Sequence, residues 1–403
     1  MNIERYRTIP FTLRNRCLAC DAAADSPLIS LPRFPITEVY VPQKPTEVLG
    51  HVDQSFHLCP QCGHGQLGRV IDPEFQYGAG SGYYYRTSTS PSGRIDLDFF
   101  LAFLNRVLGN RPLANVLEIG CNDLCLLKSL APRARRLVGV DPILKNIPVP
   151  EGTNQFTLHD GFFEDLEFAA EHDVVICKDT LEHVADPAQF LRKTLAAATP
   201  GAWFFFQFPC LDTLVAGCRF DQIFHQHVNY FSFASICHLL ARLGCTPVDF
   251  AIDYDHWGTL AIAFRKGSDR APLTAPFPPL SPSGILERYT SFQADLDHTA
   301  LRLAQASGES RYGYGAALML PVLAYHLHTD FRELRAVVDD DPNKAGLYYI
   351  NLPVPVAPSS AVSDLRDSTV LVTAIASRRN AMSILQKLFA IRPRHILYPL
   401  RTL

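Results

Sequence analysis

The sequence lacks the charge excess and the long apolar runs that mark nucleic-acid-binding and membrane proteins. Its formal net charge is only −3 at neutral pH, which gives no basic surface for nucleic acid. No segment holds the roughly 18 uninterrupted apolar residues of a membrane span, and the N-terminus, MNIERYRTIP, has charges where a signal peptide is apolar. We therefore expect a soluble cytoplasmic protein of roughly two or three domains that acts on a small molecule, with neither nucleic acid nor membrane as partner. The oligomeric state stays open.

A disulfide framework is also missing. The 11 cysteines are an odd number, and seven of them are scattered through apparent core segments. The other four form two Cys-x-x-Cys pairs, Cys17 with Cys20 and Cys59 with Cys62. Four thiolates around one ion give a closed tetrahedral zinc site, which is structural because no position is left for a substrate. We predict such a site, to which His57 and His64 add no ligand. A redox pair would have to open a helix after a strand, and neither pair does.

Glycine is scarce where a dinucleotide would need it. Residues 115–130, NVLEIGCNDLCLLKSL, predict a buried strand, a tight turn at Gly120 and a helix that Asn122 or Asp123 can cap. Asn122 and Cys125 stand where the Gly-x-Gly-x-x-Gly fingerprint has its second and third glycines, which argues against a bound pyrophosphate. Asp141 follows Gly120 by 21 residues, where a carboxylate can bind both hydroxyls of a ribose. The turn therefore suits S-adenosylmethionine; the alternative is an ordinary turn that binds nothing.

Strands and helices continue to alternate after this turn, as in a parallel sheet covered by helices. DVVICKD is a predicted buried strand, HVADPAQFLRKTLAAAT a helix and AWFFFQFP another strand. Ligands of such sheets bind beyond the carboxyl ends of the strands. We expect the cofactor to lie there, against Glu118, Gly120, Asn122, Asp141, Pro142, Phe163, Lys178 and Asp179. His183 follows the same strand end, where a lone histidine is either a packing residue or part of the site.

Two further histidines, His225 and His227, stand in an otherwise aromatic segment, RFDQIFHQHVNYF. Burial among aromatic rings would hold both imidazoles neutral and able to accept a proton at neutral pH. Metal binding by this pair is not expected, because residues two apart converge only on a strand and no carboxylate is close. The segment therefore predicts a histidine base.

The remaining segments indicate the domain organisation. We expect a zinc-binding domain at 1–75, a cofactor-binding α/β domain at 76–266, a linker rich in proline, serine and glycine at 267–284, and a second Rossmann-like domain at 285–403. Residues 74–94, rich in tyrosine, hydroxyls and glycine, predict a surface loop that either covers a ligand or is only a connection. Gly313 and Gly315 with Asp339 are a weak nucleotide signal, because Leu318 occupies the third fingerprint position.

Over nearly its whole length the sequence resembles the sugar C-methyltransferases that act on nucleotide-linked 4-keto-deoxysugars. The resemblance rests on the two cysteine pairs, YYYRTSTS, EIGCNDLCLL, and GYGAA followed by DDDPNKAG. It implies an N-terminal zinc-binding domain, a central class I methyltransferase domain that uses S-adenosylmethionine, and a C-terminal Rossmann-like domain. Two departures stand out. Leu124 replaces a glycine of the family's Asn-Asp-Gly turn, and the family's Tyr-His-Glu-His stretch is Phe224-His225-Gln226-His227 here.

The resemblance also implies a mechanism. A 4-keto group acidifies the hydrogen at C3, a base removes it, and the enolate carbon attacks the methyl group. His227 matches the family's base, and His225 and Tyr85 are expected to orient the substrate or stabilise the enolate oxygen. His183 is a further candidate catalytic residue. Gln226 cannot compensate an imidazolium charge, so we expect a weaker base than a carboxylate-paired one. An O-methyltransferase stays open for this reason; an NAD-dependent oxidoreductase and a non-catalytic zinc module are less favoured alternatives.

Overall fold

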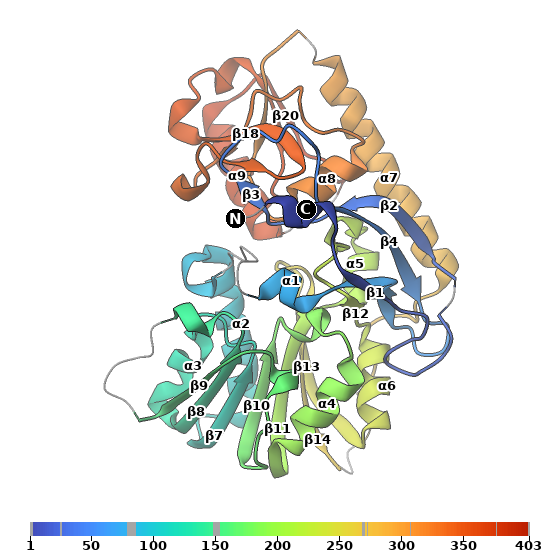
Figure 1. Cartoon of the computed structure of the whole chain (residues 1–403), viewed down its shortest axis with the longest axis vertical. Coiled ribbons are helices and arrows are strands. Elements are labelled where there is room, and N and C mark those ends of the chain that lie inside the picture. The colour runs from blue at the N-terminus through green and yellow to red at the C-terminus, as the bar shows by residue number, and fades with distance from the viewer. Residues whose placement is uncertain are drawn as a thin grey trace.

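The computed structural model describes residues 3–24, 26–78, 86–147, 154–267, 271, 273–306, 308–375 and 377–401. Figure 1 shows two helix-covered sheets, one in the lower and one in the upper half of the molecule, with the N-terminal strands beside both. This mixed α/β architecture confirms the predicted fold class. In the described part of the chain, no helix is both long enough and apolar enough to cross a membrane.

The lower sheet has seven strands in the order β13-β14-β11-β10-β7-β8-β9. The strands from β11 to β9 run parallel, and β14 and β13 are added antiparallel at one edge. Their bounds are β7 Leu113–Ile119, β8 Ala134–Asp141, β9 Phe156–Asp160, β10 His172–Lys178, β11 Ala198–Pro209, β13 Cys245–Asp253 and β14 Thr259–Lys266. The helices around them are α2 Pro91–Leu108, α3 Cys125–Leu130, α4 Pro187–Ala196, α5 Leu211–Ala216 and α6 Phe233–Arg242.

The apolar run of β10 explains why this sheet is covered on both faces. Val175 and Cys177 pack into one core layer with residues of α4 and α6, while Val174 and Ile176 pack into the other with α2 and α3. Successive residues of a strand point to opposite faces, so a strand buried on both faces needs a continuous apolar run. The register also places Cys177 beside Ile119, so that β10 and β7 end at the same edge.

The N-terminal part is a small β-rich unit. A two-stranded sheet joins β1 Phe11–Leu13 to β6 Arg69–Ile71. A four-stranded sheet has the order β12-β5-β4-β2, with β2 Ile29–Pro35, β4 His51–Leu58 and β5 Gly65–Leu67. Its fourth strand, β12 Asn229–Tyr230, comes from the segment that carries the histidine pair, so the N-terminal β-rich unit positions that segment directly.

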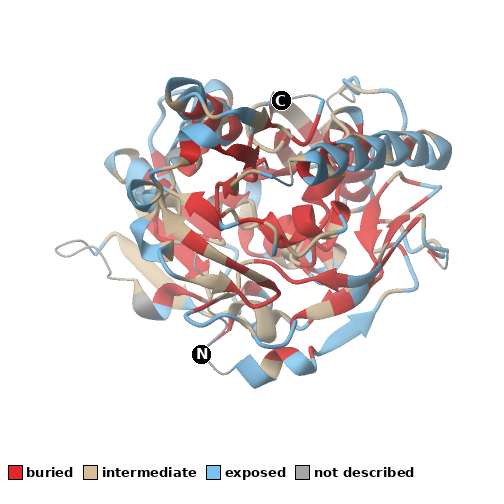
Figure 2. Cartoon of the chain, turned by 90° about the horizontal axis from the view of Figure 1, so that it is seen from above, coloured by how far each residue is buried: buried red, intermediate tan, exposed pale blue. Residues whose placement is uncertain are grey.

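The upper sheet has seven strands in the order β20-β19-β15-β16-β18-β17-β3. Their bounds are β15 Arg311–Tyr314, β16 Ala336–Asp339, β17 Tyr348–Tyr349, β18 Leu352–Pro358, β19 Thr369–Val372, β20 His395–Leu397, and β3 Tyr40–Val41 from the N-terminal part. The accompanying helices are α7 Pro282–Gln305, α8 Leu320–His326 and α9 Arg378–Ile391. Figure 2 shows long exposed stretches of helix around buried strands. Strand β3 comes from the N-terminal part but joins the upper sheet, and β12 comes from the central part but joins an N-terminal sheet. The domain boundaries therefore stay a prediction, since these two strands cross them.

Two local expectations were wrong. Residues 74–94 are not one loop, because α1 Pro73–Tyr77 ends and α2 begins within them; residues 79–85 lie outside the described chain. The helix after the glycine turn is not capped by Asn122 or Asp123, since it is preceded by Leu124 in a left-handed conformation, with φ of 67° and no side-chain cap. The two polar side chains hold another segment instead. Asn122 accepts from the backbone N–H of Thr87, and Asp123 accepts from that of Ser88.

Candidate active site

A cavity of about 480 Å³ lies beyond the carboxyl ends of β7, β8 and β10. All eight residues expected to contact the cofactor line it, together with His183 and Tyr77. The eight are Glu118, Gly120, Asn122, Asp141, Pro142, Phe163, Lys178 and Asp179. The strand ends bring these side chains together because parallel strands present their carboxyl ends at one edge of the sheet. We call this space the donor cavity.

The glycine turn and Asp141 form one wall of the donor cavity. Gly120 has a φ of 78°, and a Cβ there would lie 2.0 Å from the Thr180 hydroxyl oxygen, so only glycine fits. The Asp141 carboxylate accepts from the backbone N–H of Asn122 at 2.9 Å and from that of Ile143 at 3.0 Å. Burial raises the pKa of Asp141, and these two hydrogen bonds oppose that shift. The carboxylate is therefore fixed in place at the cavity wall.

Lys178 and Asp179 belong to a buried network of charges. The Lys178 ammonium pairs with the carboxylates of Asp96 and Asp179, and Gln207 donates from Nε2 to Asp96 at 3.0 Å. Burial alone would lower the pKa of Lys178, but the two carboxylates raise it above its usual value. His256 adds its Nε2 at 3.9 Å from Asp96. Lys178 is thus neutralised by this network, and both Lys178 and Asp179 line the cavity.

Glu118 is a buried carboxyl at the end of β7. Desolvation raises its pKa to about 8, although the nearby Lys178 charge works against this shift. One of its oxygens, Oε2, is buried without a hydrogen-bond partner among the described residues. At neutral pH the group is therefore mostly a neutral acid.

His183 lines the donor cavity and forms a group with the buried Glu182 and His227, which we call the acceptor corner. The His183 and His227 rings lie with their centroids 4.8 Å apart. Nδ1 of His183 is 2.8 Å from the carbonyl oxygen of Gln226 and 2.9 Å from the hydroxyl of Tyr77. Burial lowers the pKa of His183 to about 4 and that of His227 well below its usual value. Both imidazoles are neutral at pH 7, as the aromatic surroundings predict.

His227 is enclosed by aromatic rings. Its ring centroid lies 4.2 Å from that of Phe224 and 5.7 Å from that of Trp257, at the tip of the β13–β14 hairpin. Glu182 Oε1 is 3.9 Å from Nε2 of His227 and 3.9 Å from Nε2 of His183. The expectation that no carboxylate is near the histidine base was therefore wrong. The carboxyl comes from the residue before His183, far from His227 in the sequence.

His225 faces away from the donor cavity. A turn closed by the His227 N–H and the Phe224 carbonyl separates the two histidines, so their side chains diverge. Nε2 of His225 lies 3.0 Å from the Phe34 carbonyl oxygen, and its Nδ1 lies 3.2 Å from the Gln54 amide nitrogen. Both ring nitrogens are thus used against the N-terminal sheet, which corrects the expectation that His225 orients a substrate.

One expected site residue is not described by the structure, and two residues near the site were not expected. Tyr85 lies outside the described residues. Tyr77 and Glu182 line or adjoin the same space and were not expected. Tyr77 stood in a segment without apolar periodicity, and the only sequence signal for Glu182 was its place directly before a candidate histidine.

The four cysteines of the two Cys-x-x-Cys pairs lie close together. The sulfur atoms of Cys17 and Cys62 are 3.6 Å apart, and those of Cys20 and Cys59 are 3.4 Å apart. All four sulfur atoms lie within 4.8 Å of one another. Four thiolates about 2.3 Å from one zinc ion are separated by about 3.8 Å, so the cluster fits a tetrahedral ion. Its fourfold sulfur shell matches a closed structural site.

The C-terminal glycine turn is filled by the protein itself. The backbone N–H of Ala316 donates to Asp339, and the hydroxyls of Tyr40 and Tyr349 donate to the carbonyl oxygens of Ala316 and Ala317. Asp339 is held by its turn as Asp141 is, but here the Tyr40 hydroxyl from β3 and the Tyr349 hydroxyl also occupy the turn. Nothing here strengthens the weak nucleotide signal.

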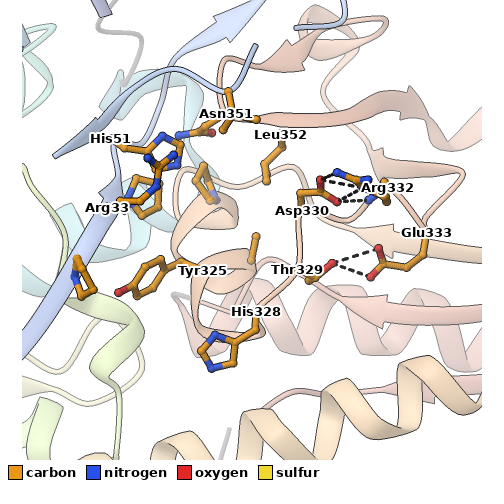
Figure 3. Close-up of a pocket in the computed structure, with 15 residues that line it drawn as sticks. Arg33, His51, Tyr325, His328, Thr329, Asp330, Arg332, Glu333, Asn351 and Leu352 are labelled. Carbon is orange, nitrogen blue, oxygen red and sulfur yellow. Dashed lines mark hydrogen bonds and ion pairs between the residues drawn. The ribbon is translucent and has the colours of Figure 1, made fainter. Parts of the chain in front are cut away.

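A second cavity, of about 630 Å³, lies between β2, β4 and α8, away from every expected site residue (Figure 3). Its acidic groups are already paired. Asp330 binds Arg332, and Glu333 accepts from the Thr329 hydroxyl. The donor cavity therefore remains the site that unites the predicted cofactor residues.

Comparison with known proteins agrees with this geometry. Residues 94–249 match a family described as "Methyltransferase domain", and residues 285–398 match "C-methyltransferase C-terminal domain". The C-methyltransferase NovU of Streptomyces niveus is 28% identical over 213 residues, which cover 51% of this chain and 49% of NovU. The ubiquinone biosynthesis O-methyltransferase of Bordetella parapertussis (strain 12822 / ATCC BAA-587 / NCTC 13253) is 33% identical over 116 residues, or 26% of this chain and 47% of that protein.

One solved structure among the similar ones is the N-methyltransferase NodS from Bradyrhizobium japonicum WM9 in complex with S-adenosyl-L-homocysteine. It is 18% identical, with a TM-score of 0.36, and covers 46% of this chain and 92% of NodS.

The chain is an S-adenosylmethionine-dependent methyltransferase, which confirms the predicted methyl donor and enzyme class. The two matched regions give the chain a methyltransferase domain and a C-methyltransferase C-terminal domain, in agreement with the resemblance seen in the sequence. The chain spans about half the length of the relatives it matches, 49% of NovU and 47% of the O-methyltransferase. Its acceptor is therefore a matter for proposal.

Proposed function

We propose that this enzyme methylates carbon C3 of a nucleotide-linked 4-keto-deoxysugar, in deoxysugar biosynthesis. The observation that carries the proposal is the acceptor corner: His183 lines the donor cavity, and His227 packs against it, so that two neutral, buried imidazoles stand together. Carbon methylation requires removal of a C–H proton before the methyl group arrives, and a desolvated neutral imidazole pair suits that task. The similarity to NovU, named a C-methyltransferase, supports the same direction.

The donor cavity offers a specific place for each part of the methyl donor. Asp141 would hold the ribose hydroxyls, while Gly120 and Asn122 allow its close approach to the turn. When bound, S-adenosylmethionine supplies an electrophilic methyl group. Phe163, Pro142 and the neutral Glu118 enclose the same space and exclude water, and the ionised Asp179 on its wall favours a cation.

The acceptor would enter beside His183 and Tyr77, which both line the cavity. Its C3 proton leaves to the acceptor corner, where His227 is the residue whose loss should stop proton removal. Trp257 and Phe224 form an apolar wall around His227 and keep it desolvated. We propose a separate, structural role for the four-cysteine cluster, which would hold one zinc ion and fix β5 and, through it, β12 beside His227.

Oxygen methylation is the second candidate. Phe224 and Gln226 lack the hydroxyl and the carboxylate of the resembled stretch, and a base for a hydroxyl acceptor needs less strength than a carbon base. The similarity to an O-methyltransferase over 116 residues supports this second candidate.

Hydrogen exchange tests the proposal directly. A 4-ketosugar nucleotide incubated with the enzyme and S-adenosylhomocysteine in D₂O should exchange its C3 hydrogen, without any methyl transfer. His227→Asn should abolish this exchange and leave S-adenosylmethionine binding intact, because asparagine keeps some polarity but is no base near neutral pH. His225→Asn is the matched control, since that ring faces the N-terminal sheet.

The product decides between carbon and oxygen. NMR of the methylated acceptor should show the new methyl carbon bonded to carbon. A methyl group on oxygen would reject the C-methyltransferase proposal and leave the acceptor corner as the site of hydroxyl deprotonation.

A further inference from the structure

A glutamate of the N-terminal part reaches the segment that carries His227. Glu38 lies between strands β2 and β3, and Gln226 donates from Nε2 to its Oε2 at 3.4 Å. Both side chains are half-buried and line a small pocket of about 40 Å³. Thr37 lines the same pocket, and its hydroxyl is buried without a partner in the part of the chain that the structure describes. A carboxylate thus stands beside the residue that precedes His227.

The backbone around Glu38 is held in an unusual conformation. Its φ is 65°, in the left-handed region that residues other than glycine rarely adopt. On one side of it, the N–H of Ile36 donates to the Gly50 carbonyl at 2.8 Å. On the other side, the Val39 carbonyl accepts from the N–H of Ile350 at 3.0 Å. Strained residues persist where their surroundings impose them, and they cluster at functional sites, so this strain points to a use for the Glu38 side chain.

Glu38 acts on both groups that hold His183. Nδ1 of His183 lies 2.8 Å from the backbone carbonyl of Gln226 and 2.9 Å from the hydroxyl of Tyr77. Glu38 accepts a hydrogen bond from the side chain of that same Gln226. Burial raises the pKa of Tyr77, and the charge of Glu38 raises it further. One carboxylate therefore reaches the acceptor corner through two neighbours of His183.

The acceptor corner needs a negative charge that its own residues do not supply. An imidazole that takes the C3 proton becomes a cation, and a nearby carboxylate stabilises that state. Glu182 Oε1 lies 3.9 Å from Nε2 of His227, but burial raises the pKa of this carboxyl well above its usual value and favours its neutral form. Gln226 is an uncharged amide where the resembled stretch has a glutamate. The Glu38 carboxylate, in contact with Gln226, is placed to supply the missing charge.

We propose that Glu38 is a positioning residue of the acceptor corner and supplies the carboxylate that position 226 lacks. The inference rests on the proposed function, because it concerns removal of the acceptor's C3 proton. Glu38 holds the side chain of Gln226, and the backbone of Gln226 holds His183. Its charge also favours the imidazolium that forms when His227 takes the proton and the bonding electrons stay on the enolate.

Exchanging the two side chains tests this assignment in the full-length enzyme. Glu38→Gln leaves two amides and removes the charge, so we expect C3 hydrogen exchange in D₂O to slow at least about fivefold. Gln226→Glu sets a second carboxylate against the first, and their repulsion should also slow the exchange. The double variant, Glu38→Gln with Gln226→Glu, again sets one amide against one carboxylate. We expect its rate to return to within about twofold of the wild type.

Two controls accompany these rates. Glu47→Gln removes another carboxylate of the N-terminal part, which pairs with Arg7 at the surface, and it should exchange like the wild type. Calorimetry should give every variant the wild-type affinity for S-adenosylmethionine, because Glu38 is not among the described residues that line the donor cavity. Exchange at the full rate by Glu38→Gln, or a double variant as slow as the slower single variant, would overturn the inference.

Thermal stability separates this inference from the proposed function. The two side chains pair in the folded protein whatever the acceptor is, so Gln226→Glu should lower the thermal midpoint and adding Glu38→Gln should restore it. If the midpoints follow this pattern but the wild type exchanges no 4-ketosugar nucleotide, the carboxylate pairing stands and the ketosugar proposal fails. If wild type and Glu38→Gln exchange the C3 hydrogen at the same rate, the ketosugar proposal stands and the inference fails.

Discussion

The hydroxyl of Tyr77 lies 2.9 Å from Nδ1 of His183, which joins the end of α1 to the residues that follow β10. Both residues line the donor cavity. Burial raises the pKa of Tyr77 well above its usual value, so the phenol stays protonated throughout the neutral range. The N-terminal part of the chain thus contributes a polar group to the donor cavity through helix α1.

Replacing Tyr77 by phenylalanine tests this contact. The variant keeps the ring and removes one hydrogen bond to an imidazole, a loss of about 1 kcal/mol. We expect kcat to fall about five- to tenfold while the dissociation constant of S-adenosylmethionine changes little. Steady-state methyl transfer and calorimetry provide the two measurements. An equal loss in cofactor affinity would instead assign Tyr77 to the methyl donor.

Asp141→Ala addresses the cofactor. The substitution removes the carboxylate expected to hold the ribose and also its hydrogen bonds to the Asn122 and Ile143 amides. We expect S-adenosylmethionine to bind at least about tenfold more weakly, or about 1.4 kcal/mol, by calorimetry. Asp160→Ala is the matched control, because Asp160 pairs with Asp141 in the next strand but is exposed. Unchanged affinity in Asp141→Ala would mean that the ribose is held elsewhere.

Cys59→Ser addresses the metal cluster. Loss of one thiolate opens the four-sulfur shell, so zinc measured by elemental analysis should fall from one to none per chain. Because β5 pairs with β12, we expect lower thermal stability and also reduced methyl transfer, through displacement of His227. Cys237→Ser, on α6 and outside the cluster, should keep the zinc. A wild-type protein purified without chelator and free of zinc would contradict the structural-zinc proposal.

Local sequence patterns were sufficient to predict which residues line the donor cavity. The strand, turn and helix around Gly120 and the acidic residue after β8 depend on neighbours along the chain, and parallel strands bring their ends to one edge. The pattern did not predict what Asn122 and Asp123 bind, because Thr87 and Ser88 approach from a distant segment. Capping preferences consider only neighbouring residues, and here the contact with a distant segment replaced the local cap.

The acceptor corner could not be predicted from the sequence, because it is formed by long-range contacts that leave no periodic pattern. The two histidines were expected to act together, but a turn sends His225 to Gln54 and Phe34 and leaves His227 with Glu182. Likewise, β3 and β12 are two-residue strands whose pairing is set by other parts of the chain. Such short strands carry too little alternation to be recognised from sequence.

The pH dependence of stability provides a last prediction, centred on Glu118. Desolvation raises its pKa in the folded protein to about 8 from 4.5. The folded state therefore binds more protons than the unfolded state between these two values, and stability must fall as pH rises through this window. The protonated group's contribution is fully present below pH 4.5 and lost by about pH 8, with a slope of at most about 1.4 kcal/mol per pH unit.

Glu118→Gln isolates this contribution, because glutamine has nearly the shape of the protonated acid and does not titrate. Other groups titrate equally in both proteins, so only the difference in thermal midpoint between variant and wild type is informative. We expect the variant to gain stability relative to wild type as the pH is raised from about 5 to about 8, and the difference to level off above that. A difference that does not change with pH would show that Glu118 is ionised in the folded protein, which would place a second negative charge, beside that of Asp179, on the wall of the donor cavity.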